Sequence, residues 1–243
     1  MMELALCSEA GERCRGRIIE APGFKLYVPP DLVYEVWANI IHVVCLDDYM
    51  LLRLPGRPRS VVDAGAFVGV FTLHLLRNIG AERIVAVEPS PRALSLLKTN
   101  LELNNVADAV EVVKAALAPT RGEAVLHVAE GLVNSSLLRD YPPRRGRGIV
   151  ARLRVRTVTL GELLEQPFSL LKLDIEGMET VVLRSAVEQG VLSPYRAAAV
   201  VVELHSARDL AEAEGLLREA GYSILGVEKD EEFQQYFILA AAP

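Results

Sequence analysis

The feature of this sequence that most constrains its fold is the regular alternation of short apolar runs with amphipathic segments after residue 60. The runs predict seven strands, at 60–63, 83–88, 110–117, 170–175, 197–204, 222–227 and 235–241. Strands that alternate with helices are typical of an open, mostly parallel sheet that carries helices on both faces. We therefore predict an α/β fold whose last two strands form an antiparallel pair at the edge of the sheet.

Capping residues mark where several helices are expected to begin. Ser90 stands directly before Pro91, and both residue types favour the start of a helix. Thr159 and Glu162 have the spacing of a capping box. Further helices are predicted over 68–78, 176–189 and 206–220, the last with Ser206 as its cap.

The chain divides into an N-terminal extension over residues 1–59 and a main domain over 60–243, with a hairpin-like insertion at about 121–158. Within the extension, 24–28 alternates like a strand, and Asp31 is expected to cap a helix that runs to about residue 44. This helix carries an apolar stripe that we expect to join the core rather than a dimer interface: Val33, Val36, Trp37, Ile40, Ile41 and Val44.

Composition and charge exclude several classes of protein. The net charge is −6, whereas sequence-independent binding of nucleic acid usually needs a basic face. No apolar stretch is long enough to span a membrane and no secretory signal is evident, so a cytoplasmic protein is expected. The chain has 21 Arg, 5 Lys, 6 Asn and 4 Gln, a composition that suits a hot-growing source or a GC-rich genome equally well.

The three cysteines indicate neither a disulfide framework nor a zinc site. Their number is odd, and Cys7 and Cys14 lack a second Cys/His pair at a ligand spacing. Cys45 lies in an apolar run, which predicts a small buried side chain.

The strongest local motif is a strand that ends in an acid and a glycine turn, Val61-Val-Asp63-Ala-Gly65-Ala-Phe-Val-Gly69. Glycines in such a turn let a ligand approach the backbone at the carboxyl end of the strand. The spacing is Asp-x-Gly-x-x-x-Gly rather than the Gly-x-Gly-x-x-Gly of dinucleotide enzymes, which disfavours a nicotinamide oxidoreductase. An acid at this place disfavours a pyrophosphate, whereas the ammonium and sulfonium of S-adenosylmethionine are compatible with it.

A second acid follows the second strand. Glu88 lies 19 residues after Gly69, close to the ~20 residues that separate the glycine turn from the ribose-binding acid in dinucleotide enzymes. A carboxylate at this place accepts hydrogen bonds from both ribose hydroxyls. Together, the two motifs predict a site for an adenosyl ligand.

The fourth strand ends in a run of charged residues, Lys172-Leu-Asp174-Ile-Glu176-Gly177-Met-Glu179. Alternation along the strand places Lys172 and Asp174 on the same side. Asp174, at the strand tip, is the stronger functional candidate, whereas Glu179 fits helix electrostatics and acceptor binding equally well. Hard oxygen ligands cluster here and at Glu203, but nothing in the spacing demands a metal and none is expected.

The order of these motifs resembles the FkbM family of methyltransferases. The match extends over about residues 60–205, and Lys-x-Asp-x-Glu-Gly-x-Glu is its most specific part. The segments that carry it are Val-Asp63-Ala-Gly65-x-x-x-Gly69, Glu88-Pro89-Ser90, Asn100-Leu-x-Leu-Asn104, Ser135-Ser136-Leu, Thr159-Leu, Leu-Lys172-Leu-Asp174-Ile-Glu176-Gly177-x-Glu179 and Val-Glu203-Leu-His205. The resemblance implies a class I, Rossmann-like, S-adenosylmethionine-dependent enzyme, typically an O-methyltransferase.

The resemblance also implies places for the parts of the cofactor. The methionine part would lie at Asp63, Gly65 and Gly69, the ribose at Glu88, and the adenine by the backbone of 115–117. Asp174 would lie by the cofactor amine or the acceptor. The residues expected to bind the cofactor are Asp63, Gly65, Ala66, Phe67, Gly69, Glu88, Pro89, Ala116 and Asp174. The sequence departs from the family at Ala66-Phe67, where many members have Ala-Asn, so one polar contact near the methionine end is in doubt.

Transfer to a hydroxyl needs an aligned acceptor and a base. The catalytic candidates are Asp174 and His205 as bases, and Lys172, which either orients the acceptor or pairs with Asp174. The expected acceptor is a small-molecule or glycan hydroxyl. Two alternatives stay open: an RNA methyltransferase, which the arginines in the loop 144–147 would favour, and an S-adenosylmethionine-binding protein without catalysis.

Overall fold

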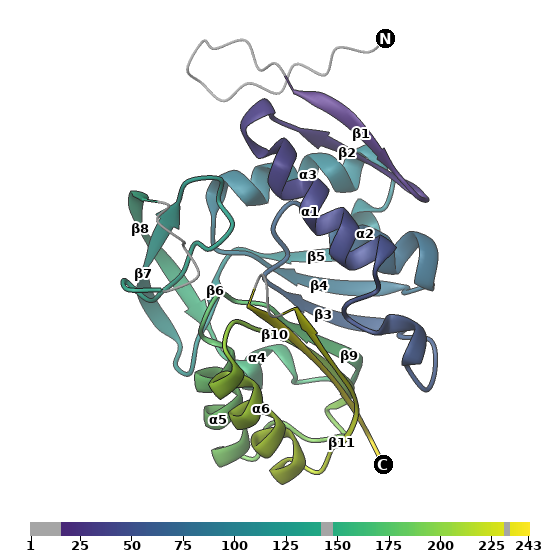
Figure 1. The fold of residues 1–243 in the computed structure, drawn as a ribbon, viewed down its shortest axis with the longest axis vertical. Coiled ribbons are helices and arrows are strands. Elements are labelled where there is room, and N and C mark those ends of the chain that lie inside the picture. Colours follow the sequence, from purple (N-terminus) through teal and green to yellow (C-terminus); the bar gives the residue numbers. More distant parts are fainter. Residues whose placement is uncertain (1–15, 142–147, 231–233) are drawn as a thin grey trace.

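The computed structural model describes residues 16–141, 148–230 and 234–243, and its centre is a seven-stranded sheet (Figure 1). In spatial order its strands are β11 (Ser223–Asp230), β12 (Gln235–Ala241), β10 (Ala197–Leu204), β9 (Phe168–Leu173), β3 (Ser60–Ala64), β4 (Arg83–Val87) and β5 (Val110–Val113). The five strands from β10 to β5 are parallel, and β12 pairs antiparallel with both β10 and β11. The predicted α/β fold with an antiparallel pair at the edge is confirmed.

The chain reverses its direction of travel across the sheet at β3. It runs outward from β3 to β4 and β5, and then crosses back to β9 on the other side of β3. The register places Asp63 opposite Lys172, so the charged ends of β3 and β9 lie side by side. Ligands bind beyond the carboxyl ends of strands at such a switch point.

Helices cover both faces of the sheet, as Figure 1 shows. The face that carries the N-terminal segment has α2 (Val70–His74) and α3 (Pro91–Leu103), and the opposite face has α5 (Glu179–Glu188) and α6 (Ala207–Glu219). The predicted caps are confirmed at Ser90, Thr159 and Ser206, each of which accepts a backbone N–H; Thr159 forms its capping box at the start of α4 (Leu160–Leu163). Among the described helices, none is long and apolar enough to cross a bilayer.

Two helices begin later than predicted, because left-handed backbone precedes them. Gly69 has φ 96°, and α2 therefore begins at Val70. Glu176 and Gly177 have φ 57° and 97°, so the residues before Glu179 form a loop instead of the first turn of α5. Left-handed residues cannot lie inside a right-handed helix.

The predicted third strand also divides in two. β5 ends at Val113, where the amide of Ala115 turns back to donate to the Val113 carbonyl at 3.0 Å. The remainder, β6 (Ala116–Leu117), pairs with β8 (Ile149–Val158) in a separate three-stranded sheet. β8 also pairs antiparallel with β7 (Gly122–Ala129), which gives the hairpin of the insertion. The arginines 144, 145 and 147 lie outside the described residues, as do Cys7 and Cys14.

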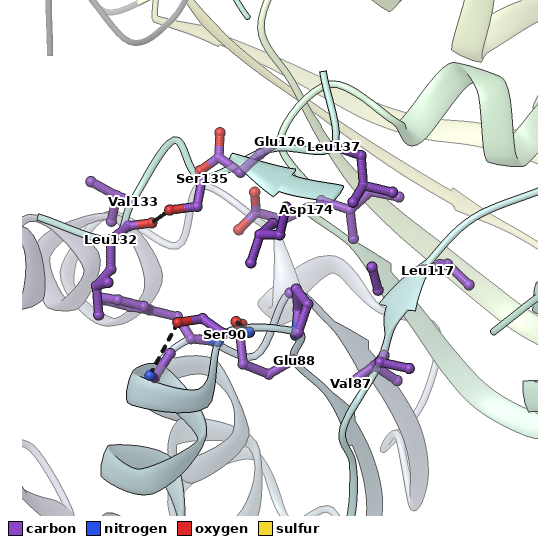
Figure 2. A pocket seen from close by; sticks show the side chains of 18 of the residues that line it. Val87, Glu88, Ser90, Leu117, Leu132, Val133, Ser135, Leu137, Asp174 and Glu176 are labelled. Atoms are coloured by element: carbon purple, nitrogen blue, oxygen red, sulfur yellow. Dashed lines mark hydrogen bonds between the residues drawn. The ribbon is translucent and has the colours of Figure 1, made fainter. Parts of the chain in front are cut away.

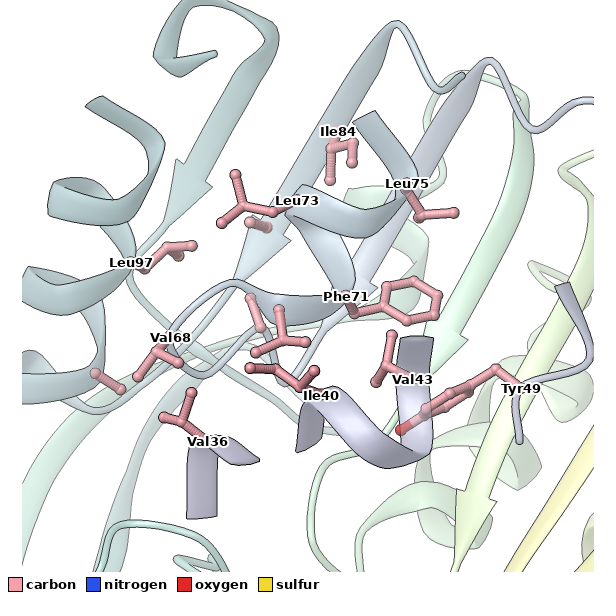
Figure 3. Packing of buried hydrophobic residues seen from close by; sticks show 14 of the residues in the cluster. Val36, Ile40, Val43, Tyr49, Val68, Phe71, Leu73, Leu75, Ile84 and Leu97 are labelled. Carbon is pink, nitrogen blue, oxygen red and sulfur yellow. The ribbon is translucent and has the colours of Figure 1, made fainter. Parts of the chain in front are cut away.

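The N-terminal segment packs over α2 and α3. β1 (Arg17–Ala21) and β2 (Phe24–Val28) form a hairpin, and α1 (Val33–Ile40) continues into a π-helical turn at Ile41–Cys45. Figure 3 shows how side chains of this segment meet those of α2 in one apolar cluster. The residues it labels are Val36, Ile40, Val43, Tyr49, Val68, Phe71, Leu73, Leu75, Ile84 and Leu97.

Three predictions for this segment are wrong. Asp31 caps no helix and instead pairs with Arg92 at 2.7 Å. Trp37 and Ile41 of the apolar stripe are 45% and 44% exposed, because the stripe is wider than the face that α1 presents to α2. Cys45 is exposed rather than buried, since it lies in the last turn before the chain leaves the helix.

Candidate functional site

A cavity lies at the carboxyl ends of β3 and β4, at the switch point of the sheet (Figure 2). It holds about 750 Å³ of empty space, part of it open to solvent. We call it the first cavity. It is lined by Asn39, Gly65, Phe67, Val87, Glu88, Pro89, Ser90, Ala93, Ala115, Ala116, Leu117, Leu126, Leu132, Val133, Ser135, Leu137, Asp174, Ile175 and Glu176.

Gly65 lets the ends of β3 and β9 come together at this cavity. Its φ is 83°, and a Cβ added to it would lie only 1.7 Å from the carbonyl oxygen of Asp174. The peptide N–H of Gly65 is held at 2.9 Å by the Val87 carbonyl. A side chain at residue 65 would therefore displace Asp174, which explains why the motif needs glycine here.

Glu88 is the acid that lines the first cavity next to the glycine turn. Its two carboxylate oxygens accept hydrogen bonds from the amides of Phe67, at 3.0 Å, and Ser90, at 2.8 Å. Burial raises the pKa of Glu88 to about 7, although both hydrogen bonds favour the ionised form. Figure 2 shows this side chain between the start of α3 and the end of β4.

The other residues predicted to bind the cofactor divide into two groups. Phe67, Pro89 and Ala116 line the first cavity, but Ala66 does not. Gly69 does not line it either: a Cβ there would lie 2.7 Å from Leu97, so this glycine allows α2 and α3 to pack closely.

The prediction that Asp63 touches the cofactor is not supported by its position. Asp63 is completely buried below the cavity, where its Oδ2 accepts a 2.6 Å hydrogen bond from Thr72 and its Oδ1 lies 3.3 Å from the Lys172 ammonium. Lys172 is equally buried; it also pairs with Asp174 at 3.2 Å and donates to the Gly65 carbonyl at 2.8 Å. Burial opposes the charge on Lys172, but Asp174 and Asp63 together raise its pKa. Of its two predicted roles, Lys172 has the pairing role.

A second, larger cavity adjoins the first. It holds about 1640 Å³ of empty space, part of it open to solvent. Four residues line both cavities: Asn39, Val133, Asp174 and Glu176. The remaining residues of the second cavity are Tyr34, Glu35, Trp37, Ala38, Ile41, His42, Val43, Leu46, Tyr49, Asn134, Glu203, His205, Asp230 and Gln235. The two cavities thus meet at the end of β9.

The wall of the second cavity is acidic and aromatic. Five carboxyl groups line it, and its described lining includes no Lys or Arg. These acids are Glu35, Asp174, Glu176, Glu203 and Asp230. Three aromatic residues, Tyr34, Trp37 and Tyr49, come from the N-terminal segment. Such a wall suits a neutral or cationic ligand with apolar surface and repels a polyanion.

Glu203 and His205 extend from the end of β10 into the same region. Tyr49 donates to Glu203 at 2.5 Å and lies 3.4 Å from Asp174. Burial, followed by the charge of Asp174, raises the pKa of Glu203 to about 8. Burial opposes a charge on His205, but the surrounding carboxylates, Glu176 first, outweigh this effect and raise its pKa to about 9.

The loop after β9 is held by its own acids. Glu179 is buried and accepts hydrogen bonds from the amides of Ile175, at 2.6 Å, and Gly177, at 2.9 Å. Glu179 lines neither cavity, so the structure favours a local structural role over acceptor binding. Glu176 accepts from the Asn134 amide at 3.0 Å and from the Tyr141 hydroxyl at 2.8 Å, which ties this loop to the insertion.

Sequence reasoning did not identify several lining residues of the site. Tyr49 and Asn39 belong to the N-terminal segment, which carried no motif, and the insertion contributes Val133. Glu203 was visible only as part of a family motif and as a hard oxygen ligand. These four residues lie far from Asp174 in the sequence, and only the packing of the folded chain brings them to the same cavities.

Comparison with known proteins gives the family. The model of the methyltransferase FkbM domain matches residues 63–224. Methyltransferase sdnD from Sordaria araneosa is 26% identical over 202 residues, which cover 71% of this chain and 76% of that protein. Methyltransferase 1 from Beauveria bassiana is 30% identical over 223 residues, which cover 83% and 86%.

A solved structure agrees at the level of the fold. Methyltransferase FkbM from Methylobacillus flagellatus KT superposes with a TM-score of 0.53 at 17% sequence identity. The superposition covers 75% of this chain and 44% of that protein, so the present chain spans less than half of its length. The predicted family resemblance is confirmed by the family match over more than half of the chain and by the relative that is 30% identical. This chain belongs to the FkbM family of methyltransferases and is a methyltransferase enzyme.

Proposed function

We propose that S-adenosylmethionine binds in the first cavity and that its methyl group passes to a hydroxyl of a small-molecule or glycan acceptor bound in the second. The observation that carries this proposal is the position of Asp174, whose side chain lines both cavities. A group at the junction of two sites is placed to contact both the methyl donor and the acceptor oxygen.

The residues of the first cavity fit this cofactor. The backbone at Gly65 is open to close approach, and the Glu88 carboxylate is positioned to accept hydrogen bonds from ribose hydroxyls. Ala115, Ala116 and Leu117 line the cavity with small or apolar side chains, which suit contact with the adenine ring. When bound, the cofactor supplies a methyl group on a sulfonium that is already activated for displacement.

The chain itself orients the acceptor and takes its proton. Lys172 and Tyr49 both lie at Oδ2 of Asp174, at 3.2 Å and 3.4 Å, and so fix the carboxylate. Within the described part of the chain, Oδ1 of Asp174 has no hydrogen-bond partner, and it is free to accept the hydroxyl proton as the oxygen–methyl bond forms and the sulfur–methyl bond breaks. We prefer Asp174 to His205 as the base, because a histidine with a pKa of about 9 is already protonated at neutral pH.

The second cavity supports a small acceptor over the alternatives. Its acidic wall opposes the phosphate backbone of RNA, for which a basic surface is required. A large cavity that meets the first at a carboxylate also argues against a protein that only binds the cofactor. A cytoplasmic location and a thermophilic source remain expectations from composition.

Calorimetric titration with S-adenosylmethionine, and separately with NAD, tests the cofactor assignment. We expect saturable binding of S-adenosylmethionine alone. Formation of S-adenosylhomocysteine is then measured with a panel of hydroxylated small molecules and glycans, and with tRNA. Turnover on tRNA with a steep salt dependence would replace our acceptor by RNA, and binding without turnover on the whole panel would favour a non-catalytic role.

A further inference from the structure

We propose that Asp174, Glu203 and His205 form a binding site for a divalent metal ion at the junction of the two cavities. One ligand atom of each residue lies within 4.8 Å of those of the other two. Ligand atoms that bind a single ion at ~2.1 Å lie at most ~4.2 Å apart, so small side-chain rotations that draw these three atoms together would complete the set.

The fold explains why these three groups meet. β9 and β10 are neighbouring parallel strands, and their carboxyl ends therefore lie at the same edge of the sheet. Asp174 directly follows β9. Glu203 is the second-to-last residue of β10, and His205 directly follows that strand. The spacing in the sequence demanded no metal, because it did not reveal that the histidine joins the two acids.

The burial and hydrogen bonding of the His205 ring support the metal site independently of the distances. Its side chain is 8% exposed, and its Nε2 is completely buried without a hydrogen-bond partner. The Glu176 carboxylate is 3.6 Å away, beyond hydrogen-bond range, and the ring packs edge-on against Tyr141. A buried imidazole nitrogen without a partner is costly, and neutral imidazole is the commonest side-chain ligand of metal ions.

The two carboxylates are oriented but not saturated. Glu203 accepts one hydrogen bond at each oxygen, from Gln235 at 2.9 Å and from Tyr49 at 2.5 Å, which leaves a lone pair on each for a metal. Such outer contacts are what fixes metal ligands in place. Lys172 is shared between Asp63 and Asp174, so one ammonium faces two carboxylates and a negative charge remains.

The donor set of two carboxylates and one imidazole suits a first-row divalent ion such as Mn²⁺, with Mg²⁺ and Zn²⁺ as competitors. Metal binding uses the neutral form of the imidazole. The chemical role of the ion rests on the proposed function: an ion open to the second cavity would bind the acceptor hydroxyl and lower its pKa, and Asp174 would then bind the metal through one oxygen.

Electron paramagnetic resonance with Mn²⁺ on the metal-free full chain tests the site. We expect one bound Mn²⁺ per chain, with nitrogen coupling in the pulsed spectrum from one imidazole. His205→Gln should abolish the nitrogen coupling and weaken Mn²⁺ binding about tenfold or more, and Glu203→Gln, which preserves the shape of the side chain, should weaken it while leaving the coupling. The control is His42→Gln, since His42 lines the same cavity but pairs with Asp48 at 2.6 Å.

No binding of Mn²⁺, Mg²⁺ or Zn²⁺ up to about 1 mM, the weak limit for functional cation sites, would overturn this proposal. The same holds if Mn²⁺ binds but loses its nitrogen coupling in His42→Gln rather than in His205→Gln. In either case calorimetric binding of S-adenosylmethionine would be unaffected, so failure of the metal site is distinguishable from failure of the proposed function.

Discussion

The two cavities of this enzyme are built in different ways. The first takes most of its polar wall from the turns that directly follow β3, β4 and β9, so its key residues lie within motifs that are local in sequence. The second combines α1, the loop before β3, the insertion and the end of β10, which are far apart along the chain. Asn39, Val133, Asp174 and Glu176 line both cavities.

The two cavities therefore differ in which part of the chain shapes them, the backbone in the first and side chains in the second. The first cavity depends on backbone geometry, as at Gly65, where any side chain would collide with the carbonyl oxygen of Asp174. The second depends on side chains presented by segments at the margin of the sheet, among them the half-exposed Trp37. Its walls can therefore change without disturbing the strands that hold the first cavity.

The largest expected effect is at the junction. Asp174→Asn removes the proposed base while it preserves the size of the side chain, so we expect turnover to fall about 10²–10⁴-fold. Binding of S-adenosylmethionine should change far less. The measurement is S-adenosylhomocysteine formation with an accepted hydroxyl compound, and wild-type turnover would return Asp174 to a structural role.

Lys172 tests whether the ion pair beneath both cavities is structural. Lys172→Met leaves Asp63 charged, buried and without its partner, and should lower the free energy of unfolding by about 3–5 kcal/mol. Combining it with Asp63→Asn should restore part of that loss. Denaturant unfolding measures both, with the exposed Lys98→Met as control; an unchanged stability would show that the pair is not required for folding.

Glu88 tests the first cavity alone. Glu88→Gln removes a charged acceptor, and we expect S-adenosylmethionine to bind about 1.5–3 kcal/mol more weakly by calorimetry. The Michaelis constant for the acceptor should not change, since Glu88 does not line the second cavity. Equal affinity in the variant would show that the ribose lies elsewhere.

The pH dependence of cofactor binding sharpens the same assignment. The pKa of Glu88 in the folded chain is about 7, raised from 4.5 by burial. Folding therefore favours the protonated form of Glu88, and this contribution to the free energy of unfolding is lost as the pH rises from 4.5 to about 7. Cofactor binding, in contrast, needs the ionised carboxylate. Affinity for S-adenosylmethionine should thus fall about tenfold for each pH unit below 7, and Glu88→Gln should flatten the profile.

The smallest expected effect is on the second cavity. Trp37 is 45% exposed on its wall, so Trp37→Ala should leave stability within about 0.5 kcal/mol of wild type. It should raise the Michaelis constant for an acceptor with apolar surface several-fold, because an aromatic contact is worth about 0.5–1.5 kcal/mol. An unchanged constant with every acceptor would remove this wall from the binding site.

Much of the fold was predictable because it follows from local patterns. The apolar runs predicted all seven strands of the main sheet, and Ser90, Thr159 and Ser206 correctly marked helix starts. The errors arose where backbone geometry overrode pattern, as at Glu176, whose left-handed conformation delays α5. The exposed Cys45 shows the same limit, since an apolar run does not reveal which turn leaves the core.

The sequence by itself determined the order of strands and turns along the chain, and the glycine where β3 and β9 approach each other closely. It also determined the family. All of these depend on residues near one another along the chain. Only the tertiary structure decided the rest. It buried Asp63 beneath the cavity, paired it with Lys172, and brought Tyr49 and His205 to Asp174. Contacts between segments that are far apart along the chain depend on how whole layers pack, and no local pattern encodes that packing.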